Sequence, residues 1–178
     1  MCKGKLTIYC GTGRGKSSAA IGNAVFAAEA GKSVIIIQFL KSKAKSSVSL
    51  LERLEPEIKL FRFERSECEY GELSEEEREE EKKNIKNGLG YARKVLGTGE
   101  CDMLVLDEIM GLLDMGIVDG KDLKEIFDAA HSDVEIVLTG RRLDERIAKK
   151  ADEVYFIEPG EKEKKKDKNN KNDKSRKN

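Results

Sequence analysis

A glycine-rich stretch near the start of the chain constrains the fold more than any other feature. Residues 6–10 are mostly apolar, β-branched or aromatic, and they predict a short strand. Glycines then occupy every second position over residues 11–15, followed by Lys16, Ser17 and an alanine-rich run that predicts a helix. This order is typical of a phosphate-binding loop, because glycines let successive backbone N–H groups point at one anion.

This loop supplies candidate ligands for a nucleotide. Lys16 would provide a mobile positive charge, the Ser17 hydroxyl is suited to Mg²⁺, and the start of the helix adds partial positive charge. The usual motif has a glycine where this chain has Cys10, so the alternative is an ordinary glycine turn. We prefer the phosphate-binding interpretation. The predicted nucleotide-binding residues of the loop are Gly11, Thr12, Gly13, Arg14, Gly15, Lys16, Ser17 and Ser18.

Strands and helices are predicted in alternation along the rest of the chain. Further strands are predicted over residues 33–39, 58–63, 103–106, 134–138 and 154–157. Helices are predicted over residues 50–55, 75–96, 119–130 and 143–150. The longest helix begins with a capping box formed by Ser74 and Glu77, although two internal glycines leave its continuity open. The alternation predicts an α/β fold with a mostly parallel sheet and helices on both faces.

Polar residues follow several of the predicted strands. Gln38 and Lys41 come after the second strand, Asp107 and Glu108 after the fourth, and Arg141 after the fifth. Ligands of parallel sheets bind beyond the carboxyl ends of the strands, so we expect these side chains to converge on one nucleoside triphosphate. Gln38, Lys41 and Arg141 are predicted to contact the nucleotide, with pairing to an acidic neighbour as the alternative for Arg141.

The apolar strand that ends in Asp107 and Glu108 has the form of a Walker B strand. Its carboxylates could hold Mg²⁺ directly or through water, opposite the Ser17 hydroxyl. Ser17, Asp107 and Glu108 are therefore the predicted metal ligands, and Lys16 and Glu108 the predicted catalytic residues. Periodicity and spacing alone leave the reaction open, because a hydrolase could also use Glu108 to activate water.

Composition limits the remaining possibilities. Lysine plus arginine and aspartate plus glutamate both number 34, which gives no reason to expect nucleic acid as a partner. Apolar runs such as residues 34–37 are far too short to cross a membrane, and the four cysteines form no C-x-x-C pair. We therefore expect a cytoplasmic protein with reduced thiols. Residues 1–159 are predicted to form one domain, and the Lys- and Asn-rich tail, residues 160–178, to be disordered.

The full set of motifs resembles the P-loop ATP:corrinoid adenosyltransferases of cobalamin biosynthesis and salvage. The matching segments are residues 11–20, 31–34, 38–41, 106–108, 139–141 and 151–154. They occur in the order and near the spacing of that family over residues 5–157, and the short G-x-G-x-G-K-[ST] loop is the form that the family uses. The resemblance implies a RecA-like P-loop NTPase fold and a homodimer, with a reducing flavoprotein as a candidate partner.

The resemblance also implies a reaction. The 5′-deoxyadenosyl group of ATP would pass to the Co(I) centre of a reduced corrinoid, with triphosphate as the leaving group and ATP lying in the loop in the reverse of the usual direction. Co(I) is a strong nucleophile, so the protein would position the reactants and neutralise charge through Lys16 and through Mg²⁺ on Ser17 and Glu108. The alternatives are a P-loop ATPase or small-molecule kinase with Asp107 and Glu108 as Walker B, and a nucleotide-binding carrier.

The chain departs from the family pattern at several places, including the corrinoid-binding stretch and the helix after the loop. Members of the family carry a Gly-Phe-Thr-Trp-like stretch that packs against the corrinoid, whereas this chain has no tryptophan. The corresponding residues 61–70 offer only Phe63 and Tyr70 as substitutes. Phe26 stands in the helix after the loop where many members have arginine.

Overall fold

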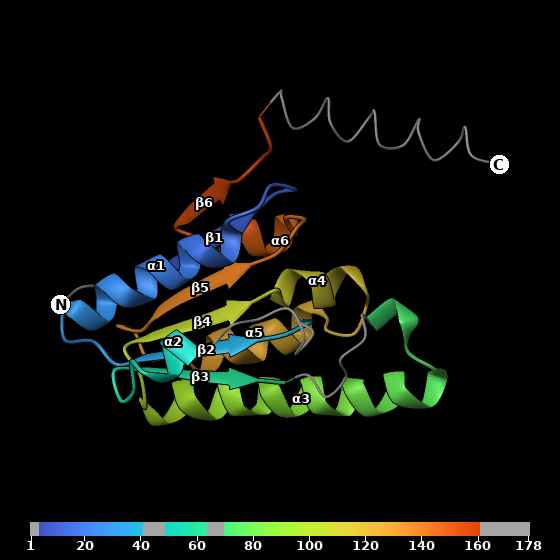
Figure 1. Ribbon diagram of the computed structural model, residues 1–178, viewed down its shortest axis with the longest axis horizontal. Coiled ribbons are helices and arrows are strands. Elements are labelled where there is room, and N and C mark those ends of the chain that lie inside the picture. The colour runs from blue at the N-terminus through green and yellow to red at the C-terminus, as the bar shows by residue number, and fades with distance from the viewer. Residues whose placement is uncertain (1–3, 41–48, 64–69, 161–178) are drawn as a thin grey trace.

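Six parallel strands form one sheet in the computed structural model, which describes residues 4–40, 49–63 and 70–160 (Figure 1). The strands are β1 (Leu6–Cys10), β2 (Val34–Gln38), β3 (Ile58–Arg62), β4 (Met103–Asp107), β5 (Glu135–Thr139) and β6 (Glu153–Phe156). Their order is β3-β2-β4-β5-β1-β6, and every neighbouring pair is parallel. All carboxyl ends therefore lie at one edge of the sheet, as predicted.

The helices lie on both faces of this sheet. They are α1 (Lys16–Glu29), α2 (Ser49–Glu52), α3 (Glu75–Thr98), α4 (Ile109–Asp114), α5 (Gly120–Ala129) and α6 (Glu145–Ala148), with a 3-10 turn, η2 (Tyr70–Glu72). The small side chains of α1 allow it to pack closely on one face, where Ala20 and Ala24 lie in a cluster with Val105 and Val137. Helices α3, α4, α5 and α6 contribute to a second apolar cluster on the other face. Both apolar clusters confirm the predicted α/β architecture.

Helix α3 is longer than predicted and has no break at its glycines. Its capping box is formed, since the Ser74 hydroxyl accepts from the Glu77 N–H and the Glu77 carboxylate accepts from the Ser74 N–H. A Cβ at Gly88 would lie 2.7 Å from Cγ of Phe63 and 2.8 Å from Cε1 of Phe39. Gly88 therefore provides space for two aromatic rings and does not interrupt the helix.

Helix α4 and the turn η2 occupy segments where no helix was predicted. Residues 161–178 lie outside the described part of the chain, so disorder of the tail stays a prediction. None of the helices among the described residues has the length and hydropathy of a membrane span.

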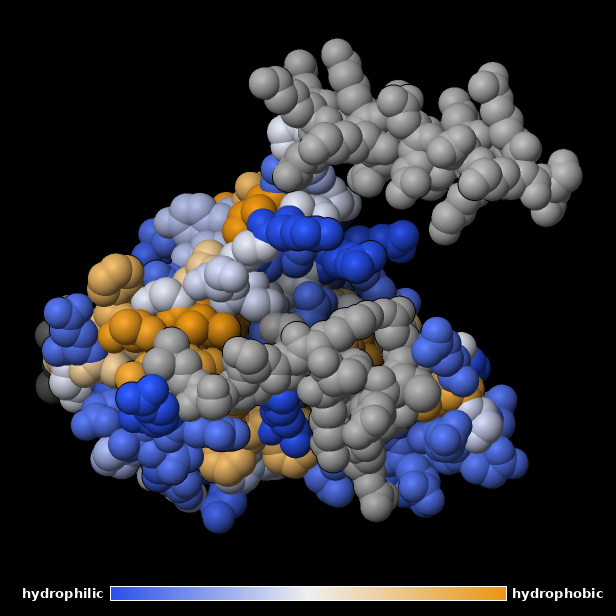
Figure 2. Space-filling model, in the orientation of Figure 1, coloured by the Kyte–Doolittle hydropathy of each residue, from blue (hydrophilic) through white to orange (hydrophobic). Residues whose placement is uncertain are grey.

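Figure 2 shows apolar side chains gathered over α1. This helix includes Phe26, which has 70% of its surface exposed.

Candidate functional site

The glycine loop connects β1 to α1 in the predicted way. Gly11 has φ 119° and Gly15 has φ 110°, both in the left-handed region that glycine adopts without strain. A Cβ at Gly11 would also lie 2.4 Å from the carbonyl oxygen of Ile157, whereas a Cβ at Gly15 would meet open space. The backbone conformation therefore requires glycine at both positions, and close packing requires it again at Gly11.

The first half of the loop, residues 11–13, is held by hydrogen bonds to distant parts of the chain. The Gly11 N–H donates to the Arg141 carbonyl (3.0 Å), and the Gly13 N–H donates to the Ile157 carbonyl (2.8 Å). The Thr12 N–H donates to one oxygen of the Glu158 carboxylate (3.2 Å), and the Thr12 hydroxyl donates to the other. Glu158 was not predicted at this site.

The second half of the loop, residues 14–18, contains the groups that are suited to binding phosphate. The Lys16 side chain is buried, and its Nζ donates to the Gly13 carbonyl at 2.8 Å. The first helical hydrogen bond runs from the Ala19 N–H to the Gly15 carbonyl (2.8 Å), so the N–H groups just before it face the loop without an acceptor inside the helix. The side chains of Arg14 and Ser18 are exposed. This arrangement provides an anion site at the start of a helix.

Asp107 joins the loop to the neighbouring strands. Asp107 is the last residue of β4, and only 1% of its surface is exposed. It accepts hydrogen bonds from the Ser17 hydroxyl (2.8 Å), the Thr139 hydroxyl (2.6 Å) and the Gln38 amide (2.9 Å). The Gln38 oxygen accepts in turn from Nε of Arg62 (3.2 Å). Buried carboxylates need such donors, and those of Asp107 come from three separate elements, α1, β2 and β5.

Strand register explains this network. Gln38 pairs in register with Arg62 on β3 and with Asp107 on β4, so the three side chains form a row across neighbouring strands. The structure thus brings Gln38, Asp107 and Ser17 together as predicted. The Gln38 side chain is hydrogen-bonded to Asp107 and Arg62. Arg62 was not predicted, because it ends an edge strand of alternating pattern.

Glu108 has a strained backbone beside Asp107. Its φ is 65°, which is uncommon for a residue other than glycine, and it precedes the first residue of α4. Its N–H donates to the Thr139 hydroxyl at 2.8 Å, and one carboxylate oxygen lies 3.6 Å from where a Cβ of Gly111 would be. Such strain is concentrated at functional sites in proteins.

The oxygen atoms of Ser17 and Asp107 are suited to Mg²⁺ with a nucleotide. The Ser17 Oγ lies 2.8 Å from the nearer Asp107 oxygen, and both are hard donors. No group of three or more histidine, cysteine, aspartate or glutamate residues that could hold a metal occurs among the described residues. Mg²⁺ commonly combines one or two carboxylates with water and substrate phosphates, so this sparse donor set fits that ion.

The other predicted residues have varied positions. The Arg141 side chain is exposed. Asp144, an acidic neighbour that could have paired with Arg141, forms an ion pair with Arg146. Lys41 lies outside the described residues.

Phe63 and Tyr70, the two aromatic residues considered as corrinoid contacts, both contact other side chains of the protein. Phe63 lies 6.1 Å from Tyr91, ring centre to ring centre, and the Tyr70 ring lies 5.9 Å from the Arg78 guanidinium.

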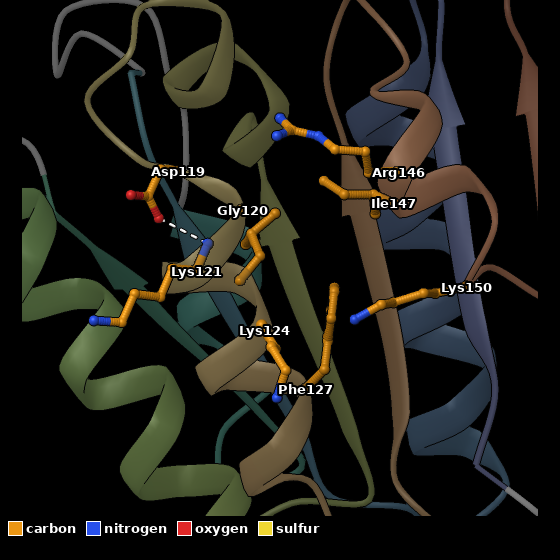
Figure 3. A pocket seen from close by; sticks show the side chains of 9 residues that line it. Asp119, Gly120, Lys121, Lys124, Phe127, Arg146, Ile147 and Lys150 are labelled. Atoms are coloured by element: carbon orange, nitrogen blue, oxygen red, sulfur yellow. Dashed lines mark hydrogen bonds between the residues drawn. The ribbon is translucent and has the colours of Figure 1, made fainter.

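A separate cavity of about 380 Å³ lies between α5 and α6 (Figure 3). Its lining includes Lys121, Lys124, Arg146 and Lys150. Lys124 and Arg146 are in ion pairs with acidic neighbours, and Nζ of Lys150 lies 5.7 Å from the centre of the Phe127 ring. None of the residues predicted at the nucleotide site lines this cavity.

Comparison with known proteins identifies the family. The model of the family described as ATP:corrinoid adenosyltransferase BtuR/CobO/CobP matches residues 2–174. The chain belongs to this family. It is therefore assigned as a corrinoid adenosyltransferase, and the family description names ATP and a corrinoid as substrates.

Two individual relatives are similar over most of the chain, and one of them has the activity of this family in its name. The corrinoid adenosyltransferase of Escherichia coli (strain K12) is 24% identical over 157 residues, which cover 88% of this chain and 78% of that protein. An uncharacterized protein of Nostoc sp. (strain PCC 7120), all2391, is 27% identical over 162 residues, covering 84% of this chain and 42% of that protein.

Among solved structures, the KaiC-like protein PH0186 from Pyrococcus horikoshii OT3 is similar in fold. Its TM-score is 0.52 at 17% identity, with 89% of this chain and 74% of that chain covered. At this identity the likeness concerns the fold alone. It agrees with the RecA-like P-loop fold that the sequence predicts.

Proposed function

We propose that this adenosyltransferase moves the 5′-deoxyadenosyl group of ATP to the Co(I) centre of a reduced corrinoid and releases triphosphate. The observation that carries the proposal is the family match over residues 2–174. It is supported by a formed phosphate loop in which the Ser17 hydroxyl donates to Asp107.

The proposed step needs no proton transfer by the protein. The electron pair of Co(I) forms a bond to C5′ of the ribose, and the bond from C5′ to the triphosphate oxygen breaks. The triphosphate leaves with that electron pair, and the cobalt is formally oxidised to Co(III). The protein therefore has to hold the reactants in line and stabilise the charge on the leaving group.

Lys16 and the start of α1 would stabilise the leaving triphosphate. Nζ of Lys16 donates to the Gly13 carbonyl, within the loop, and would exchange that carbonyl for a phosphate oxygen. Ser17, Asp107 and Glu108 would hold Mg²⁺, which would neutralise part of the triphosphate charge. Gln38 and Arg62 would fix the direction of the Asp107 carboxylate through their hydrogen bonds. Direct contacts of Lys41 and Arg141 with ATP stay predictions.

One observation favours a second candidate, a P-loop ATPase or small-molecule kinase. Glu108 follows the Walker B aspartate in a strained conformation, where a carboxylate can activate a water molecule or a hydroxyl group. That reaction would release ADP and leave a corrinoid unchanged.

An anaerobic assay with Mg-ATP and chemically reduced cob(I)alamin distinguishes the two candidates. We expect adenosylcobalamin in the visible spectrum and an equimolar amount of triphosphate by chromatography. We expect Lys16→Ala to lower the rate by about 10²–10³-fold, the usual loss for one electrostatic donor. Lys94→Ala, at an exposed position on α3, is the matched control. ADP with unchanged corrinoid would contradict the proposal and favour the second candidate.

A further inference from the structure

The carboxylate of Glu158 occupies the first half of the phosphate loop. It accepts from both the backbone N–H and the hydroxyl of Thr12, which lies 146 residues earlier in the chain. Neither the motif nor the family comparison assigns a role to Glu158.

The chain after β6 runs directly along the loop. The Ile157 N–H donates to the Cys10 carbonyl at 2.8 Å, which extends the pairing of β1 with β6 by one residue. The Ile157 carbonyl accepts from the Gly13 N–H at 2.8 Å. Glu158 is thus placed beside the loop by the preceding residue, whose backbone N–H and carbonyl are both hydrogen-bonded.

The glycines of the first half provide room for this segment. A Cβ at Gly11 would lie 2.9 Å from a carboxylate oxygen of Glu158, and a Cβ at Gly13 would lie 2.7 Å from the Ile157 carbonyl oxygen. A Cβ at Gly15, by contrast, would meet nothing within 4 Å. The close approach at Gly11 and Gly13 is therefore to the protein's own chain, whereas the space at Gly15 is open to a ligand.

The loop is consequently divided in two. The N–H groups of Gly11, Thr12 and Gly13 all donate to protein acceptors. Lys16 and the start of α1 belong to the second half. A carboxylate beside the first half repels any phosphate that would lie there, and the repulsion grows with the charge of the ligand.

We infer that Glu158 is a specificity-determining residue of the nucleotide site. Its carboxylate confines the triphosphate chain to the second half of the loop and weakens binding of the free triphosphate product more than binding of ATP. This inference rests on the proposed function, since free triphosphate is a product only of adenosyl transfer. Free triphosphate carries more negative charge than the same group esterified in ATP, so one fixed negative charge discriminates between them.

Calorimetric titration with inorganic triphosphate and with ATP, without corrinoid, tests this inference. The Glu158→Gln variant removes the charge and keeps one acceptor oxygen for the Thr12 N–H, while its amide NH2 group can donate to the Thr12 hydroxyl oxygen. We expect it to bind triphosphate about tenfold more tightly than the unmodified protein, with a smaller gain for ATP. The gain should shrink at high salt, because Glu158 is exposed.

Two further variants separate charge from packing. Glu158→Asp retains the charge, and we expect it to discriminate against triphosphate as the unmodified protein does. Glu29→Gln makes the same change of charge at an exposed position near the far end of α1, and its affinities should be unchanged. Thermal unfolding of each variant checks that the fold is retained.

The results also distinguish this inference from the proposed function. Unchanged or weaker triphosphate binding by a folded Glu158→Gln variant, with adenosyl transfer intact, would overturn the inference alone. If the unmodified protein bound neither ATP nor triphosphate, the proposed function and the inference would both be wrong.

Discussion

Asp107 shows how one buried carboxylate can organise a site. It accepts from side chains on α1, β2 and β5, and it is almost inaccessible to solvent. One carboxylate oxygen accepts from both Ser17 and Thr139, and the other accepts from Gln38. A hydrogen bond to a charged group contributes about 1.5–3 kcal/mol, so the loss of a donor should destabilise the fold. The network thus links the stability of the fold to the position of Ser17 on the phosphate loop.

Glu108 can be tested as a metal ligand. We expect Glu108→Gln to raise the Mg²⁺ concentration needed for adenosyl transfer, because an amide oxygen binds Mg²⁺ less strongly than a carboxylate. Binding of ATP in the absence of Mg²⁺ should not weaken, because the change removes a negative charge from the site. Titration of the initial rate with Mg²⁺ at saturating ATP measures the first effect, and calorimetry with EDTA measures the second.

Asp114→Asn is a suitable control for this experiment, since Asp114 ends α4 and is exposed. If Glu108→Gln bound Mg-ATP more tightly while all turnover stopped, the role of Glu108 as a metal ligand would be wrong. A general base would then be the better description.

At the level of single residues, the sequence predicted those that belong to local motifs. Lys16, Ser17 and Asp107 could be predicted because a loop and a strand end place them without knowledge of the tertiary fold. Glu158 could not, because it begins a charged segment that looks like any solvated tail. Its partner, Thr12, is identified only when β6 pairs with β1.

The elements themselves were predicted well where periodicity was strong. All six strands occur close to their predicted positions, and β3 lies at an edge of the sheet. Helix α4 was missed because its apolar residues directly follow Glu108, with none of the usual signals for a helix start. Its start is set by the positive φ of Glu108, a conformation that the sequence gives no reason to expect.

Two glycines of α3 provide a matched pair of tests. Gly88→Ala should destabilise the protein by about 1–3 kcal/mol, because the new methyl group would overlap the rings of Phe63 and Phe39. Gly90→Ala meets nothing within 4 Å, and it should stabilise the protein by up to about 1 kcal/mol through helix propensity. Urea unfolding of both variants measures the two free energies.

The two substitutions are chemically identical and lie one half-turn apart, so each is the control for the other. Equal stabilisation by both would contradict the packing of Phe63 and Phe39 against α3. It would mean that the aromatic rings lie elsewhere in solution.

At the scale of the whole molecule, a small number of long-range contacts complete the site. Strand β1 lies between β5 and β6, so the phosphate loop emerges between segments from the C-terminal part of the chain. The class of fold follows from the alternation of strands and helices. The order of the strands does not, because every apolar strand would fit several positions in a parallel sheet.

Removal of residues 161–178 tests the predicted domain boundary. We expect the shortened protein to bind ATP and to unfold at the same temperature as the full chain, because the site and both apolar clusters lie before residue 160. Thermal unfolding and calorimetry measure the two properties. A chain that ends at residue 152 is the control, and it should lose both properties because it lacks β6 and Glu158.

A clear loss of ATP affinity on removal of residues 161–178 alone would contradict this boundary. The predicted homodimer is tested separately by light scattering on the full chain. The predicted flavoprotein partner is tested by the rate of cobalt reduction in a mixture of the two proteins.

The dependence of the phosphate loop on Ile157 and Glu158 has a consequence for biosynthesis. The acceptors for Thr12 and Gly13 leave the ribosome only about 140 residues after the loop itself. A nascent chain thus carries the nucleotide motif in an incomplete geometry until Glu158 has been synthesised. The loop is synthesised before the segment that completes it, so we expect a nascent chain to hold ATP only after β6 has paired with β1.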